Sequence, residues 1–328
     1  MARAWHLKSR PSGMPNQENF DLKDVELPPL KDGQVRVRNL WLSVDPYMRG
    51  RMNDVKSYVP SFQVGEPLEG GAIGEVVESK ADGLRPGDLV QHMSGWRDEA
   101  VLSGHGANKL PNLGFPPEQF LGVLGVTGAT AYFGLLEVAR AREGDVVFVS
   151  AAAGAVGSVV VQIAKAKGMT VIASAGGAEK CEWVRSLGAD QVIDYKAAPI
   201  LKGLAAAAPE GIDVYFDNVG GDHLDAAFAL ARNNARFAVC GMIQGYNDPA
   251  PRSFKFLPRI IAARIMVKGF LVLDYYPRIA DFYAEMGPWI AAGVVKSRET
   301  IVDGLDKVPD AFLGLFNGEN TGKMLVRL

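Results

Sequence analysis

Residues 146–180 read VVFVSAAAGAVGSVVVQIAKAKGMTVIASAGGAEK, and this stretch decides the fold. A short apolar run, Val146 to Val149, has the length and the β-branched residues of a buried parallel strand. Small residues with two glycines follow it, then a helical pattern with one apolar face, then a second buried strand, Thr170 to Ser174. A strand, a helix and a strand in this order predict a βαβ unit.

The turn between the first strand and the helix indicates a dinucleotide site. It reads AAGAVG from Ala152 to Gly157, the pattern G-x-G-x-x-G with alanine at the first position. In this pattern Gly154 lets a pyrophosphate approach the backbone, and Gly157 lets the helix pack close to the strand. The helix amides from Ala155 and Val156 onward are expected to face the anion. A purely structural glycine turn is the alternative, but the flanking strand and helix favour the binding site.

The end of the second strand indicates which dinucleotide binds. Folds that bind NAD usually place Asp or Glu about 20 residues past the glycines to hold the ribose 2′-hydroxyl. Here residues 173–177 read ASAGG, the first acid is Glu179, and Lys180 follows it. Small residues beside a cation suit a 2′-phosphate, so the sequence predicts NADPH. The alternative is that Lys180 is an ordinary solvated residue in the first turn of a helix.

Composition sets the broad class. The 328 residues are 48% apolar and 22% charged, as expected of a soluble protein with two domains and a sizeable core. The net charge of −2 gives no general attraction to nucleic acid or to anionic membranes. The N-terminus lacks the apolar core of a signal peptide and no run of 18 apolar residues occurs, so we expect a cytoplasmic protein.

Metal ligands are sparse in the sequence. The two cysteines, Cys181 and Cys240, cannot form a Cys-rich zinc site, and the four histidines are scattered singly. We therefore expect no metal. Cys240 ends a strand pattern and is expected to line a site rather than to react.

Strand and helix patterns divide the chain into two domains. Short strands separated by turns, up to about Gly122, predict a mostly antiparallel β domain. From Thr127 onward six strands alternate with helices, which predicts a doubly wound parallel sheet with ligands beyond the carboxyl ends of the strands. A lone final strand, Lys323 to Arg327, needs the first domain as its partner. We therefore expect residues 1–122 and 299–328 in one domain and residues 123–298 in the other.

One loop of the first domain mixes charges with bulky residues. Residues 42–52 read LSVDPYMRGRM and contain Asp45, Tyr47, Arg49 and Arg51. These side chains could be catalytic, but an Asp–Arg network that braces the loop explains them equally well and is the favoured interpretation.

Seven motifs in the right order resemble the zinc-independent medium-chain dehydrogenases/reductases. Within that family the resemblance is to the prostaglandin reductase (leukotriene B4 12-hydroxydehydrogenase) and curcumin reductase group, and it covers nearly the whole chain. The motifs are LSVDPYMRGRM at 42–52, LGVLGVTGATA at 121–131, AAAGAVG at 151–157, GGAEKC at 176–181, FDNVGG at 216–221, CGMIQGYN at 240–247 and NGENTGK at 317–323.

The resemblance implies a GroES-like catalytic domain beside a Rossmann domain that binds NADPH. It implies that Lys180 and Tyr195 hold the 2′-phosphate ribose. The remaining cofactor would be lined by Asn218, Cys240, Gly241, Met242, Tyr246, Phe270, Leu271, Val272 and Asn320. Zinc-dependent relatives carry Gly-His-Glu where residues 67–71 read PLEGG here, which makes zinc chemistry improbable.

The resemblance also implies a reaction, the reduction of the carbon–carbon double bond of an α,β-unsaturated ketone or aldehyde. Hydride adds to the β carbon, and negative charge develops on the carbonyl oxygen, which needs a hydrogen-bond donor. Tyr246, just past the fifth strand, is the first candidate for this catalytic donor and Tyr58 the second. Either ring could instead form an aromatic wall of the pocket.

Two other functions remain open at this stage. The chain could be an NADPH quinone oxidoreductase, which shares the zinc-free fold, or a non-catalytic protein that only binds NADPH. A homodimer joined through the sixth strand of the parallel sheet is expected by analogy of fold alone.

Overall fold

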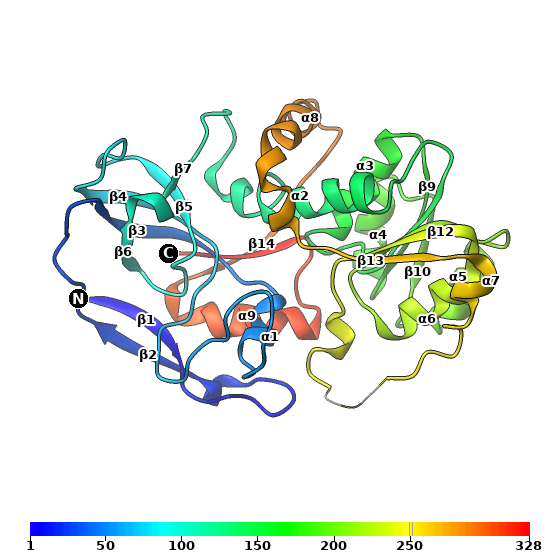
Figure 1. Cartoon of the computed structure of the whole chain (residues 1–328), viewed down its shortest axis with the longest axis horizontal. Helices are drawn as coiled ribbons and strands as arrows, with labels where there is room; N and C mark the ends of the chain where they lie inside the picture. The colour runs from blue at the N-terminus through cyan, green and yellow to red at the C-terminus, as the bar shows by residue number, and fades with distance from the viewer. Residues whose placement is uncertain (249, 251) are drawn as a thin grey trace. The chain divides into compact units, whose positions relative to one another are not determined.

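The computed structural model describes residues 1–248, 250 and 252–328, and the chain forms two compact units (Figure 1). Residues 1–121 and 299–328 form one, here called the terminal unit because it contains both chain ends. Residues 122–298 form the other, the central unit. None of the helices in the described residues is long and apolar enough to cross a membrane.

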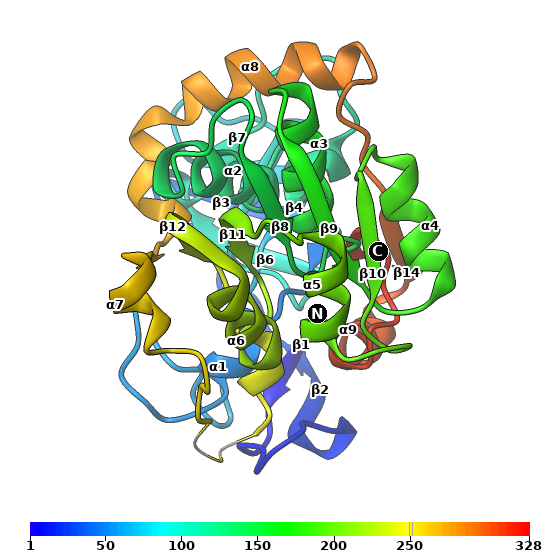
Figure 2. The ribbon, with the colours of Figure 1, turned by 90° about the vertical axis from the view of Figure 1, so that its right-hand side faces the viewer.

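The central unit is built on a six-stranded sheet in the order β10-β9-β8-β11-β12-β13, with every pair parallel. Figure 2 shows its strands side by side. The order reverses between β8 and β11, which is the point where such sheets bind ligands. The doubly wound Rossmann sheet predicted from the sequence is confirmed. The strands are β8 (Val146–Val149), β9 (Thr170–Ala175), β10 (Gln191–Asp194), β11 (Ile212–Asp217), β12 (Ala231–Val239) and β13 (Met266–Gly269).

Helices connect these strands because each connection carries one apolar face that the sheet can bury. A π-helical segment, Gly134–Val138, continues α2 without a break. The α-helices of this unit are α2 (Val126–Phe133), α3 (Gly157–Ala166), α4 (Ala178–Ser186), α5 (Ile200–Ala207), α6 (Gly221–Leu230), α7 (Arg259–Ala263) and α8 (Ile279–Ala291).

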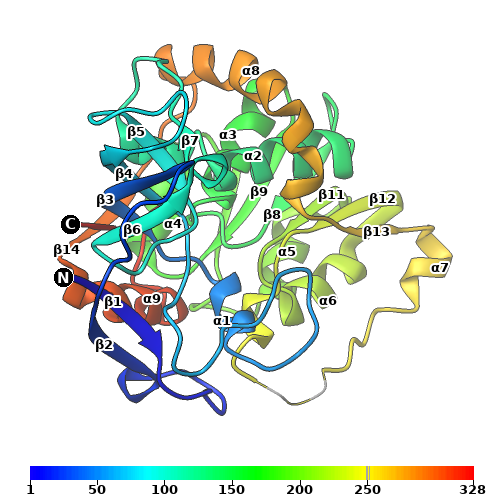
Figure 3. The same ribbon diagram turned by 60° about the vertical axis from the view of Figure 1, so that its left-hand side comes forward.

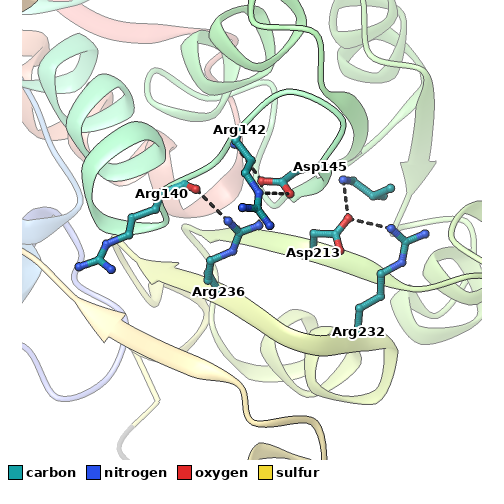
Figure 4. A network of polar contacts seen from close by, with 7 residues as sticks. Arg140, Arg142, Asp145, Asp213, Arg232 and Arg236 are labelled. Carbon is teal, nitrogen blue, oxygen red and sulfur yellow. Dashed lines mark hydrogen bonds and ion pairs between the residues drawn. The ribbon is translucent and has the colours of Figure 1, made fainter.

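Ion pairs hold the amino ends of three central strands together (Figure 4). Arg236 in β12 lies 2.7 Å from the carboxylate of Asp145, just before β8, and donates to the carbonyl of Arg140 at 2.8 Å. Asp213 at the start of β11 accepts from the Val146 amide at 2.9 Å and pairs with Arg232 at 2.8 Å. This network lies at the edge opposite to the carboxyl ends of the strands.

The terminal unit contains a seven-stranded sheet and a two-stranded β1–β2 sheet. The larger sheet has the order β14-β15-β3-β4-β5-β7, and β6 pairs with β3. All its pairs are antiparallel except β14 with β15. Its elements are β1 (Ala2–Leu7), β2 (Phe20–Val25), β3 (Gln34–Ser43), α1 (Tyr47–Arg51), β4 (Ala72–Ser79), β5 (Leu89–His92), β6 (Glu99–Ser103), β7 (Asn108–Lys109), β14 (Glu299–Asp303), α9 (Val308–Asn317) and β15 (Lys323–Arg327).

The C-terminal tail is an integral part of the terminal unit, where red and blue segments lie together (Figure 3). Strand β15 pairs antiparallel with β3, a strand of the domain that the sequence predicted as its partner. Phe312 of α9 packs edge-on against Trp96 with ring centroids 5.6 Å apart, and Phe20 stacks on the same indole at 5.6 Å. Trp96 is 1% exposed, so it is a core residue and not a pocket wall.

Several features of the fold depend on contacts between distant segments. The sixth central strand, β13, ends at Gly269, and a 3-10 segment, Val272–Arg278, precedes α8. Helix α2 continues as a π-helical segment from Gly134, where an added Cβ would lie 2.7 Å from Phe216. Strand β6 pairs with β3, and β14 pairs with β15. Close packing between distant segments determines these features, and local patterns do not report it.

Candidate active site

The glycine turn lies between β8 and α3, as the motif predicts. An added Cβ at Gly157 would lie 2.8 Å from the Cα of Ala152, so only glycine lets α3 begin this close to the strand. The Gly154 amide donates to the Ala151 carbonyl at 2.9 Å, and the Ala152 amide donates to Ser174 of β9 at 2.9 Å. These bonds fix the turn, with Ala155 and Val156 at its helix end, at the carboxyl edge of the sheet.

A buried aspartate organises the neighbouring turn after β11. Oδ1 of Asp217 accepts from the Tyr215 hydroxyl at 2.6 Å and from the amides of Val219 and Gly220 at 2.9 and 2.8 Å. The Ser150 hydroxyl also donates to it, at 3.3 Å. Asp217 is fully buried, and this burial raises the pKa of its carboxyl group above the ordinary range.

The same network fixes Asn218 and joins three turns at one edge. The Asn218 amide donates to the Ser150 hydroxyl at 2.9 Å, and its side-chain Nδ2 donates to the Ser150 carbonyl at 2.8 Å. The Asp217 carbonyl accepts from the amides of Cys240 and Gly241 at 2.8 and 3.1 Å. The structure therefore brings together the turns after β8, β11 and β12, from which most of the predicted cofactor residues come.

Sequence reasoning did not identify Ser150, Tyr215 and Asp217. A signal for two of them was present, because Tyr215 and Asp217 alternate along a strand and so share one face of the sheet. An acid at the carboxyl end of a buried strand also needs nearby donors. The hydrogen bond between Ser150 and Asp217 joins residues 67 positions apart, so local spacing in the sequence could not predict it.

The segment after β12 turns back over the end of that strand. The Tyr246 hydroxyl accepts from the Met242 amide at 3.3 Å and would lie 3.2 Å from a Cβ added at Gly241. Burial, together with the charge of Asp217, raises the pKa of the Cys240 thiol to about 12. The thiol is therefore protonated at neutral pH, which suits a wall of the site and not a nucleophile.

Tyr195 and Lys180 lie at the carboxyl ends of β10 and β9. The Tyr195 hydroxyl would lie 2.7 Å from a Cβ added at Gly176, so the ring lies directly against this glycine. Lys180 is in the first turn of α4, and its pKa is lowered by partial burial and by the charge of Lys196. The nearby acid Glu179 forms an ion pair with Arg298 at 3.1 Å. The negative charge of Glu179 is thus balanced by the positive charge of Arg298.

Phe270, Leu271 and Val272 follow the end of β13 at the same edge of the sheet. The Phe270 ring packs edge-on against Phe216 with centroids 6.2 Å apart. Gly134 makes room for both rings, because an added Cβ there would overlap Phe270. The π-helical segment thus supports the backbone that follows β13.

Tyr58 and Asn320 belong to the terminal unit, whereas the other predicted site residues belong to the central unit. Tyr58 is 55% exposed in the connection between α1 and β4. Asn320 donates from Nδ2 to the Gly322 carbonyl at 2.8 Å, immediately before β15.

The charged loop at residues 42–52 is braced by contacts with other segments of the terminal unit. Asp45 pairs with Lys323 at 3.0 Å, Arg51 with Glu69 at 2.8 Å, and Arg49 donates to the Gly13 carbonyl at 2.8 Å. Lys323 is 4% exposed. The Asp45 carboxylate and two backbone carbonyls compensate the buried ammonium group.

Tyr47 of the same loop is largely buried, and its burial and the charge of Asp45 raise the pKa of its phenol. The hydroxyl is therefore protonated at neutral pH. In residues 1–248, 250 and 252–328, the His, Cys, Asp and Glu side chains form no group of three or more that could hold a metal ion.

The sequence is similar to known proteins over nearly its whole length. Residues 3–110 match the family described as the N-terminal domain of oxidoreductase, and residues 155–292 match zinc-binding dehydrogenase. The chain is 42% identical to the NADPH-dependent curcumin reductase of Escherichia coli, with 99% of this chain and 96% of the relative covered. The chain belongs to the medium-chain dehydrogenase/reductase family.

Within the medium-chain dehydrogenases/reductases it falls in the zinc-independent prostaglandin reductase and curcumin reductase group, as the motifs indicated. It is 39% identical to mouse prostaglandin reductase 1, with 99% of each chain covered. The crystal structure of CurA with NADPH from Vibrio vulnificus is 42% identical, with a TM-score of 0.94 and 99% of this chain and 98% of that chain covered. The expected Rossmann and GroES-like layout of this family is confirmed.

Proposed function

We infer that this protein reduces the carbon–carbon double bond of α,β-unsaturated ketones and aldehydes with NADPH. The observation that carries the inference is its full-length similarity to a curcumin reductase and a prostaglandin reductase, both near 40% identity. The two relatives are named for different substrates. What they share is a double bond conjugated to a carbonyl, so we assign the activity at the level of that chemical class.

The residues of the central unit fit NADPH. Gly157 allows the close approach of α3 that a pyrophosphate site needs, and the three joined turns place backbone amides at one edge. Lys180 and Tyr195 would hold the 2′-phosphate ribose, where Arg298 balances the acid Glu179. Asn218, the segment from Cys240 to Tyr246, and Phe270 to Val272 would line the remaining cofactor, with Asn320 from the terminal unit. When bound, NADPH supplies the hydride.

The protein's own task is to orient the substrate and stabilise the negative charge on its carbonyl oxygen. We propose that the Tyr246 hydroxyl donates a hydrogen bond to this oxygen. The Tyr246 hydroxyl lies 3.3 Å from the Met242 amide, and a tyrosine hydroxyl can both accept and donate a hydrogen bond. Tyr58 is the second candidate for this donor. We further propose that the protein acts in the cytoplasm.

The test is a panel of substrates with product analysis. Loss of NADPH absorbance is followed with a long-chain 2-alkenal, a 15-keto-prostaglandin, curcumin and a quinone, and NADH is run in parallel. We expect enone turnover with NADPH strongly preferred, and a product that has gained two hydrogens at the former double bond while keeping its carbonyl. Turnover of the quinone alone would replace the proposal with a quinone oxidoreductase, and tight NADPH binding without turnover would support a binding protein.

We also propose a homodimer joined through β13. This strand pairs with β12 on one side only and is the last strand of its sheet. Apolar side chains are exposed on it and beside it, with Val267 41%, Leu273 55% and Ile261 84% exposed. An exposed apolar edge strand is a ready surface for pairing with another chain.

A further inference from the structure

The turn after β10 places a second lysine beside the one that the sequence identified. A Cβ added at Gly176 would meet the Tyr195 hydroxyl at 2.7 Å and Cε of Lys196 at 3.0 Å. Both side chains therefore extend from the end of β10 across to Gly176, which follows β9. Lys196 is exposed, whereas Lys180, in the first turn of α4, is partly buried.

Both cations and acids lie near Gly176. Partial burial and the charge of Lys196 lower the pKa of Lys180, so the two ammonium groups repel each other, whereas the charge of Glu179 raises that pKa. Of the two nearby acids, Glu179 is paired with Arg298. Asp194 accepts from the amides of Gly177 and Lys196, each at 3.0 Å, through one oxygen. In the described residues, no carboxylate forms an ion pair with the Lys196 ammonium group.

The Asp194 bonds make this arrangement rigid. They join the turn after β9 to the turn after β10, so the backbone on both sides of Gly176 is fixed by one carboxylate. The edge of the His223 imidazole also packs against the Tyr195 ring, with centroids 5.2 Å apart. Two mutually repelling cations on a fixed turn would be stabilised by a divalent anion placed between them.

We propose that Lys196 is a specificity-determining residue that contacts the 2′-phosphate of NADPH together with Lys180. The two lysines then bind the phosphate near Gly176, with the Tyr195 hydroxyl as a further donor. The proposal rests on the NADPH dependence inferred above. It assigns to Lys196 a part of the preference for NADPH over NADH that Lys180 was expected to supply alone.

The experiment uses cofactor fragments, so it does not depend on the enone substrate. Calorimetry of the full-length protein measures the binding of adenosine 2′,5′-bisphosphate and of 5′-AMP, which lacks the 2′-phosphate. The variants are Lys196→Gln, Lys196→Arg and, as a matched control, Lys202→Gln, which changes an exposed lysine of α5. Thermal melting of each variant checks that it is folded.

We expect Lys196→Gln to weaken binding of the bisphosphate about fivefold at low salt and to leave 5′-AMP within about twofold of the wild type. The difference should shrink at about 0.5 M salt, because the contact is exposed to solvent. Lys196→Arg should restore most of the affinity, and Lys202→Gln should change neither ligand.

Two results would overturn the proposal. One is a Lys196→Gln variant that binds the bisphosphate as tightly as the wild type, and the other is an equal loss for both ligands, which would make the effect structural. If the wild type itself failed to prefer the bisphosphate to 5′-AMP, the NADPH assignment would fail as well. That outcome is separate from the first two, in which the wild type keeps its preference.

Discussion

At the scale of single residues, we expect a substitution of Asp217 to lower both the stability of the fold and the affinity for NADPH. Its Oδ1 accepts four hydrogen bonds, and its Oδ2 has no hydrogen-bond partner among the residues that the structure describes. Asp217→Asn keeps an acceptor for the turn but buries an amide group without an acceptor. We expect a loss of about 1 to 3 kcal/mol in the free energy of unfolding and weaker NADPH binding, because the turn that holds Asn218 is loosened. Denaturant melts and cofactor titration measure the two effects, with the exposed Asp82→Asn as the control.

The pH dependence of this loss has a defined sign. Burial raises the pKa of Asp217 in the folded protein, so the folded state holds this proton more tightly than the unfolded state does. The stability that Asp217 contributes is then fully present below the unfolded pKa of about 3.9 and falls as pH rises through the folded pKa. The stability difference between wild type and Asp217→Asn should therefore be smaller at about pH 7 than at about pH 4. A difference that grew with pH would contradict the assignment of a raised pKa.

At the scale of elements, the ion pairs at the amino ends of the strands keep β8 and β12 in place. Arg236 and Asp145 lie 2.7 Å apart with side chains 16% and 8% exposed. Among the described residues, Arg236→Gln leaves the Asp145 carboxylate with the backbone amide of Arg142 at 2.8 Å and its exposed guanidinium at 3.8 Å. We therefore expect a loss of about 2 to 3 kcal/mol in the free energy of unfolding. Arg327→Gln is the matched control, because that arginine is also 2.7 Å from its partner but lies in an exposed pair. Its loss should stay below about 1 kcal/mol. Equal losses in the two variants, measured by urea unfolding, would contradict this ranking by burial.

At the scale of the whole molecule, the proposed dimer can be tested by measuring the mass of the protein in solution. Light scattering after size exclusion should show twice the mass of the chain, and Val267→Lys should convert the dimer to a monomer by placing a charge on the edge of β13. Ile301→Lys is the control, because it adds the same charge to the edge strand β14 at a side chain of nearly equal exposure, 42% against 41%. A monomeric wild type, or a dimer that survives Val267→Lys, would exclude this interface.

Local sequence patterns predicted the strand, turn and helix of the dinucleotide motif. They did not predict contacts between segments that are distant in the sequence. Residues 146–180 show the strand, the glycine turn and the helix because each is encoded by neighbours in sequence, and the structure places all three as expected. The Asp45–Lys323 pair joins residues 278 positions apart, and no periodicity reports such a contact. For the same reason Lys196 resembles any solvated lysine in the sequence. Its place beside Gly176 follows from the pairing of β9 with β10.

The sheet position of β15 has a consequence for biosynthesis. This strand lies between β14 and β3, yet the ribosome makes it only after the whole of the central unit. The central unit is complete in sequence by residue 298 and can fold while the chain is still being made. The terminal unit cannot close its sheet until residues 323–327 have left the exit tunnel, so residues 41–43 of β3, which pair with β15, lack this partner while the whole central unit is made. A nascent chain stalled before residue 323 would expose this edge, and a chaperone that binds extended apolar strands would find its site there.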